Sequence, residues 1–124
     1  MMLEPYTYFE HDADMGIVGR GVSMAAAFEQ AASAVFAMMS DPARIRPQAS
    51  VAIEFEEADA ELALVTWLNL LLGEARSRGL IFGRFQLRRD GARWSGTAVG
   101  EPWRAGLERG VEVKGATLPG LALA

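Results

Sequence analysis

The sequence contains no cysteine, one histidine and one lysine. The absence of cysteine excludes disulfides, thiolate zinc sites and a cysteine nucleophile. Long hydrophobic runs are also missing, because the longest one, residues 62–72, is interrupted by Thr66 and Asn69 and is too short to span a bilayer. The N-terminus has no basic region ahead of an apolar run, so it does not have the pattern of a signal peptide. We therefore expect a cytoplasmic protein with no membrane partner.

Basic residues are too scattered to indicate a nucleic-acid-binding surface. The net charge is −4 and the isoelectric point is about 5.0, whereas affinity for nucleic acid rests mainly on Lys and Arg side chains that neutralise phosphates. The arginines around one predicted hairpin, which a solvated strand face explains equally well, are Arg84, Arg88, Arg89 and Arg93. We expect no direct, tight nucleic-acid binding. A protein of this charge that works near RNA would act through a protein partner.

Hydropathy patterns predict a single α+β domain. Hydrophobic residues make up 51% of the 124 residues, which is enough for the core of one ordinary domain. A helix capped by Ser23 is predicted over residues 24–39, with apolar positions at Ala27, Phe28, Ala31, Val35, Met38 and Met39. Strands are predicted at residues 6–9, 16–21, 51–56, 80–89 and 92–100 and from residue 111, with a two-residue turn at Asp90-Gly91. With a second helix, this order predicts a two-layer sandwich of two helices packed on a mainly antiparallel β-sheet.

The second predicted helix runs from the N-cap Asp59 to about Ser77, with Gly79 just past its end. Apolar residues occupy more of its circumference than a surface helix needs. The remaining narrow polar stripe comprises Thr66, Asn69, Gly73 and Arg76. We expect this helix to be buried centrally on the sheet; the alternative is that part of its apolar arc docks a partner.

The densest group of metal-capable and acid/base residues lies in the predicted turn between the first two strands, at His11, Asp12 and Asp14. Carboxylates suit calcium, magnesium or manganese, and imidazole suits transition metals. The alternative is that the aspartates cap the turn through backbone amides, with His11 as a structural hydrogen-bonding residue. Lys114, the only lysine, could pair with an acidic group or a phosphate, or could be a solvated strand charge.

Five short motifs, taken in order, resemble those of the archease family, the small accessory proteins of the RtcB-type tRNA-splicing RNA ligase. Each motif alone is weak, but together they span nearly the whole chain. They are His11-Asp12-Ala13-Asp14-Met15-Gly16, the helical Ala26-Ala27-Phe28-Glu29-Gln30-Ala31-Ala32, Asp59 with Trp67-Leu68-Asn69, Gly100-Glu101-Pro102, and Val113-Lys114-Gly115-Ala116-Thr117.

The resemblance implies a non-enzymatic role, with no catalytic residue. Archeases promote guanylylation of their ligase and its repeated turnover, and they carry a divalent-metal site described with calcium. The motif aspartate of the family falls on Asp14, which is the expected metal ligand. His11 and Lys114 are the expected residues for activation of the partner. The expected partner is an RtcB-type RNA ligase.

The chain departs from the family pattern at several positions. Asp12 stands where threonine is usual, Gly115 where alanine is usual, and Leu118-Pro119 where the family has Tyr-His. The family also continues into a final strand pair whose acidic residue completes the metal site. Residues 1–124 are therefore expected to form a single archease-like domain without that pair, with an incomplete metal site.

Two rival functions follow from the residues. One is a metal-dependent hydrolase or phosphotransfer enzyme that uses His11, Asp12 and Asp14. The other is a chaperone-like interaction module that uses the apolar face around Trp67. Nucleophilic catalysis has little support, and the glycine-rich residues 16–21 have neither a dinucleotide-binding nor a P-loop pattern.

Overall fold

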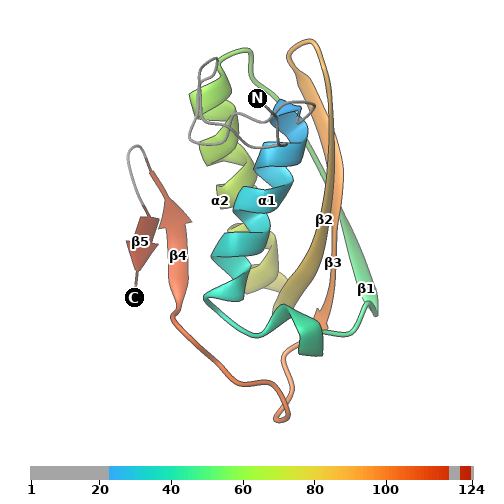
Figure 1. Ribbon diagram of the computed structural model, residues 1–124, viewed down its shortest axis with the longest axis vertical. Coiled ribbons are helices and arrows are strands. Elements are labelled where there is room, and N and C mark those ends of the chain that lie inside the picture. The colour runs from blue at the N-terminus through green and yellow to red at the C-terminus, as the bar shows by residue number, and fades with distance from the viewer. Residues whose placement is uncertain (1–22, 118–120, 124) are drawn as a thin grey trace, which may run out of the picture.

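The computed structural model describes residues 23–117 and 121–123. Within this part, two helices cover one face of an antiparallel sheet, and a separate pair of short strands lies on the other side of the helices (Figure 1). The elements are α1 (Met24–Ala37), the 3-10 helix η1 (Pro42–Arg44), β1 (Ala49–Glu56), α2 (Ala60–Arg78), β2 (Leu80–Asp90), β3 (Arg93–Pro102), β4 (Val113–Ala116) and β5 (Leu121–Leu123). The predicted α+β class is confirmed. The strands predicted at residues 6–9 and 16–21 lie outside the described residues.

The main sheet has the strand order β1-β3-β2, with both pairings antiparallel. The alternation predicted for residues 51–56 is present, since Val51 and Ile53 are buried and Phe55 is half-buried. The strand predicted from residue 111 corresponds to β4, which begins at Val113. It pairs with β5 and does not join the main sheet.

The turn between β2 and β3 lies one residue later than predicted. Asp90 pairs with Arg93, so the two loop residues are Gly91 and Ala92 rather than Asp90 and Gly91. Gly91 has φ of +64°, the left-handed region that costs glycine little. Because Gly91 occupies the first loop position, Asp90 is the last residue of β2.

Helix α1 begins as predicted but ends earlier. The Ser23 hydroxyl accepts a hydrogen bond from the amide of Ala26 at 3.0 Å, which satisfies one of the unpaired amides of the first turn. The helix ends at Ala37, two residues before the predicted end at Met39, and Met38 is 39% exposed. The buried positions of the helix are Ala27, Phe28, Ala32, Val35 and Phe36.

Helix α2 is central to the core, as predicted. Asp59 Oδ1 accepts from the amide of Leu62 at 3.0 Å, and Gly79 ends the helix with φ of +67°. The Trp67 indole donates to the Phe28 carbonyl at 3.0 Å, which joins the two helices. The buried residues of α2 are Ala63, Trp67, Leu68, Leu71, Leu72 and Ala75. No helix within residues 23–117 has both the length and the hydropathy needed to cross a membrane.

A stack of three aromatic rings joins α1 to the sheet. Trp94 lies between Phe28 and Phe55, with ring centroids 4.9 Å and 5.8 Å away and nearly parallel planes in both pairs. Offset aromatic pairs add to the stability that their buried area supplies. The Trp94 indole also donates to the Glu57 carbonyl at 3.0 Å, so its polar atom is paired within the core.

Candidate functional site

The polar stripe of α2 is the attachment surface for strand β4. Asn69 Nδ2 donates to the Ala116 carbonyl at 2.8 Å, and Asn69 Oδ1 accepts from the Ala116 amide at 2.7 Å. About two turns further along the helix, Arg76 Nη1 donates to the Lys114 carbonyl at 3.2 Å. A short strand outside the main sheet is thus fixed to the helix by three side-chain hydrogen bonds.

This attachment presents Lys114 to solvent. Its neighbours Val113 and Ala116 are buried, while the Lys114 side chain is exposed. Because the backbone of the strand is held in this way, only the Lys114 side chain remains to be ordered when its ammonium pairs with an anion. Gly115 lies beside the clamp: a Cβ at this position would be 3.1 Å from Asn69 Oδ1, so glycine leaves room for the asparagine amide.

A second cluster is built around Glu101, whose side chain is buried although it is charged. Glu101 Oε1 accepts from Arg104 Nε at 2.9 Å, and Glu101 Oε2 accepts from the Arg46 amide at 2.9 Å. The hydrogen bond from Arg104 is the largest effect on the pKa of Glu101, which is lowered from 4.5 although burial acts in the opposite direction. The carboxylate ties the segment after η1 to the end of β3, which is a structural role.

The predicted site residues are only partly placed. His11, Asp12 and Asp14 lie outside the described residues, whereas Lys114 lies within them. Within residues 23–117 and 121–123, no group of three or more His, Asp or Glu side chains is arranged to hold a metal ion.

Sequence reasoning missed two structural roles in this region. The anchoring by Asn69 and Arg76 was signalled by the narrow polar stripe on an otherwise apolar helix, but the stripe was not assigned a partner. The cluster at Glu101 was signalled only by the Gly100-Glu101-Pro102 motif, which does not indicate burial.

The fold places the chain in a class of small α+β proteins that includes a solved structure. The chain is similar to Methanobacterium thermoautotrophicum protein 1598, whose solution structure superimposes with a TM-score of 0.67 at 30% identity, over 77% of this chain and 71% of that one. Residues 6–124 match the Archease protein family (MTH1598/TM1083). The chain therefore belongs to the archease family.

Curated relatives agree with this assignment. The protein archease of Sulfolobus acidocaldarius is 40% identical over 85 residues, which cover 68% of this chain and 61% of the relative. That of Methanothermobacter thermautotrophicus is 30% identical over 119 residues, covering 93% and 85%. The matches to the Sulfolobus acidocaldarius and Sulfurisphaera tokodaii proteins thus span less than two thirds of those proteins.

Proposed function

We propose that this archease-family protein is a non-catalytic accessory protein that activates an RtcB-type tRNA-splicing RNA ligase by promoting its guanylylation and its multiple turnover. The observation that carries the proposal is the family match over residues 6–124. The relatives that support it are named archease, and the ligase partner is carried over from the family resemblance of the five motifs.

Lys114 is the proposed activating residue within the described part of the chain. It lies in the fifth motif, its side chain is exposed, and its backbone is anchored to α2. With the backbone already anchored, the ammonium can pair with a phosphate or a carboxylate of the partner without the cost of ordering the backbone that a mobile loop would incur. His11 is proposed as a second activating residue from the first motif.

A divalent cation, calcium by the resemblance, is proposed to bind at Asp14. Calcium takes several oxygen ligands, among which carboxylates are preferred. Asp14 lies outside the described residues, and within those residues no group of three or more histidine or acidic side chains could hold a metal ion. Calorimetric titration with calcium should show binding that Asp14→Asn abolishes.

The function is tested by single-turnover guanylylation of a purified RtcB-type ligase with and without the protein. The wild-type protein should raise the rate, and Asp14→Ala and Lys114→Ala should each lower this stimulation. Lys114→Arg, which keeps the charge, and Arg84→Ala, on the opposite face of the molecule, serve as controls. No stimulation by the wild-type protein would sink the proposed function, and substrate turnover by the isolated protein would favour an enzyme instead.

A further inference from the structure

A cavity of about 420 Å³ lies where the end of α2 meets the segment that leads into β4. The cavity is distinct from the exposed Lys114 side chain. The two adjoin each other, because Arg76 lines the cavity and also donates to the Lys114 carbonyl. Its volume is within the range of ligand-binding pockets. The apolar part of its lining includes Leu72, Ala75, Leu80 and Val113.

Two guanidinium groups give the cavity a positive character. Arg109 lies over the Trp103 ring, with its Cζ 4.0 Å from the ring centroid, and Arg76 Nη1 donates to the Lys114 carbonyl. Within residues 23–117, no carboxylate forms an ion pair with either arginine. Among the described residues of the lining, Glu112 is the one acidic residue, so two arginine charges face a single carboxylate there.

The rim of the cavity is held in place by hydrogen bonds to the end of α1. The amides of Gly110 and Val111 donate to the carbonyls of Met39 and Met38, each at 2.8 Å, and the Ser40 hydroxyl donates to the Glu108 carbonyl at 2.8 Å. A Cβ at Gly110 would lie 2.3 Å from the Met38 carbonyl oxygen, so this close approach requires glycine. The rim is therefore ordered before any partner binds.

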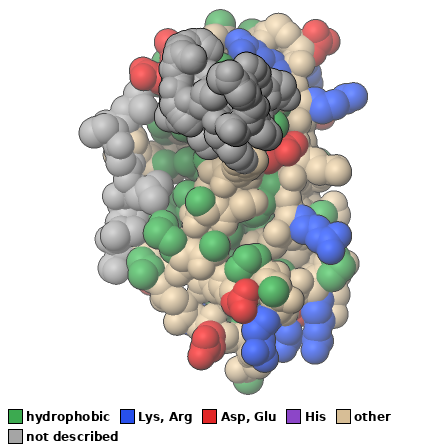
Figure 2. Space-filling model, in the orientation of Figure 1, with side chains coloured by type: hydrophobic (Ala, Val, Ile, Leu, Met, Phe, Trp, Pro, Cys, Tyr) green, Lys and Arg blue, Asp and Glu red, His purple; other side chains and the backbone are tan. Residues whose placement is uncertain are grey.

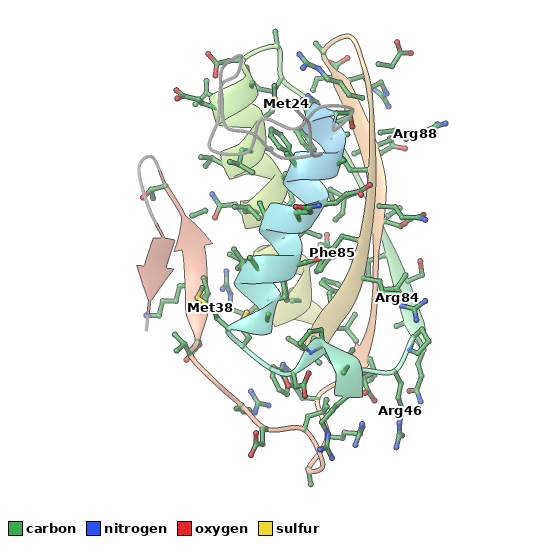
Figure 3. All side chains as sticks on the ribbon, viewed as in Figure 1. Met24, Met38, Arg46, Arg84, Phe85 and Arg88 are labelled. Atoms are coloured by element: carbon green, nitrogen blue, oxygen red, sulfur yellow. The ribbon has the colours of Figure 1, made fainter. Side chains whose placement is uncertain are left out.

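Two hydrophobic residues joined by a backbone hydrogen bond are exposed here: Val111, which lines the cavity, and Met38, whose carbonyl accepts from the Val111 amide. Val111 is 46% exposed and Met38 is 39% exposed. Figure 3 shows Met38 on the side of α1 that faces β4, and Figure 2 shows hydrophobic side chains gathered on this side of the molecule. A small ligand within the cavity would leave these side chains in water, whereas a protein segment laid across the rim would cover them.

We propose, on the basis of the function proposed above, that this cavity is a docking site for a protruding segment of the RNA ligase that carries an aliphatic side chain next to a carboxylate. The aliphatic group fits the apolar wall and the exposed rim. The carboxylate complements Arg109 and Arg76, since arginine pairs with carboxylates in a bidentate geometry. A ligase bound here would lie next to Lys114, because Arg76 belongs to both sites.

The experiment measures the affinity of the purified ligase for three variants by calorimetry. Arg109→Glu and Val111→Asp should each weaken binding by about tenfold or more, as expected for central charged and apolar contacts. Arg84→Glu is the matched control, because it makes the same charge change on the solvent-facing side of the sheet (Figure 3) and should alter the dissociation constant by less than about twofold. All three positions are exposed, so the melting temperatures should stay close to that of the wild-type protein.

Hydrogen exchange of the wild-type complex supplies a second measurement that needs no substitution. Amides of residues 109–113 should gain protection when the ligase binds, and those of residues 84–89 should not. Gly110→Ala, which displaces the rim, should reduce both the protection and the affinity.

The failure of this docking site is distinguishable from failure of the proposed function. A wild-type protein that neither binds nor stimulates the ligase overturns both. A wild-type protein that binds and stimulates the ligase, with the ligase affinity unchanged in Arg109→Glu and Val111→Asp, overturns the docking site alone. Two other results would also overturn the proposal that a ligase segment occupies the cavity. A wild-type dimer that Arg109→Glu converts to monomer would assign the cavity to a second copy of the protein. Binding of inorganic phosphate that only Arg109→Glu abolishes, with the ligase affinity unchanged, would assign it to a small anion.

Discussion

Replacing Asn69 by alanine should loosen the attachment of strand β4 to helix α2, because it removes two of the three side-chain hydrogen bonds that join them. The asparagine amide makes two hydrogen bonds to the same residue, at 2.8 Å to the Ala116 carbonyl and at 2.7 Å from the Ala116 amide. Asn69→Ala removes both and leaves the backbone groups of a buried residue without that partner. Helix propensity changes in the opposite direction, since alanine is the better helix former.

The expected size follows from the two bonds. Each neutral hydrogen bond contributes about 1 kcal/mol net, so their loss costs about 2 kcal/mol. The higher helix propensity of alanine returns about 0.5 kcal/mol. Because Asn69 itself is exposed, water can reach part of the site and limits the penalty for unpaired groups. We expect the free energy of unfolding to fall by about 1.5–2 kcal/mol.

Urea unfolding measures the global effect, and native-state hydrogen exchange of the Ala116 amide measures the local one. Gln48→Ala is the matched control, since it removes an amide side chain at an exposed loop position and should stay within about 0.5 kcal/mol of the wild-type protein. Unchanged protection of Ala116 together with a loss below about 0.5 kcal/mol would refute the two-bond clamp.

Four further substitutions test other parts of the fold. Glu101 has a lowered pKa, so its contribution to stability is present above pH 4.5 and is lost as the pH falls through the lowered value. Between about pH 6 and about pH 3, the melting temperature of Glu101→Gln should therefore drop less than that of the wild-type protein. An equal drop would contradict the role of this carboxylate. Gly73→Ala should stabilise the protein by about 0.5–1 kcal/mol, since a Cβ there meets nothing within 4 Å. Gly79→Ala should destabilise it by about 1 kcal/mol, because φ at this position is +67°. Urea unfolding in which both substitutions change the stability in the same direction would contradict this pair of predictions. Trp67→Phe should cost about 2–4 kcal/mol in the same assay through a lost bond to the Phe28 carbonyl and a smaller ring, and a change below about 0.5 kcal/mol would refute the buried role of the indole.

Both helices could be predicted because the signals that define them are local. Ser23 and Asp59 bond the amides three residues ahead, and Gly79 adopts the left-handed conformation at the end of α2. The wide apolar arc of α2 correctly predicted central burial, because the helix packs on the sheet and on α1 and is fastened to β4 by its polar stripe. The end of α1 was misplaced because the methionines continue the helical spacing, although the backbone there turns to bond the segment at residues 110–111.

The pairing of distant segments could not be predicted from local patterns. Nothing in residues 113–116 indicates that this strand bonds to Asn69 rather than to the main sheet, since an alternating strand is compatible with either neighbour. The burial of Glu101 also depends on two groups far apart in the chain, the Arg46 amide and the Arg104 guanidinium. The one-residue shift of the hairpin turn arises because Gly91 can occupy either loop position.

The candidate site was predicted in part. Lys114 was singled out as the only lysine and as part of a family motif, and the structure describes it as an exposed residue on an anchored strand. Its partners in that anchoring came only from the structure. The roles of Asp14 and His11 remain predictions, because both residues lie outside the described part of the chain.

The account is tested most directly by the number of ligation events that each RtcB-type ligase molecule completes in the presence and absence of this protein. With GTP and RNA in excess, the ligase alone should stop after few events, and a substoichiometric amount of the wild-type protein should restore sustained turnover. Lys114→Ala should restore less. An equal number of ligation events with and without the wild-type protein would contradict the proposed function.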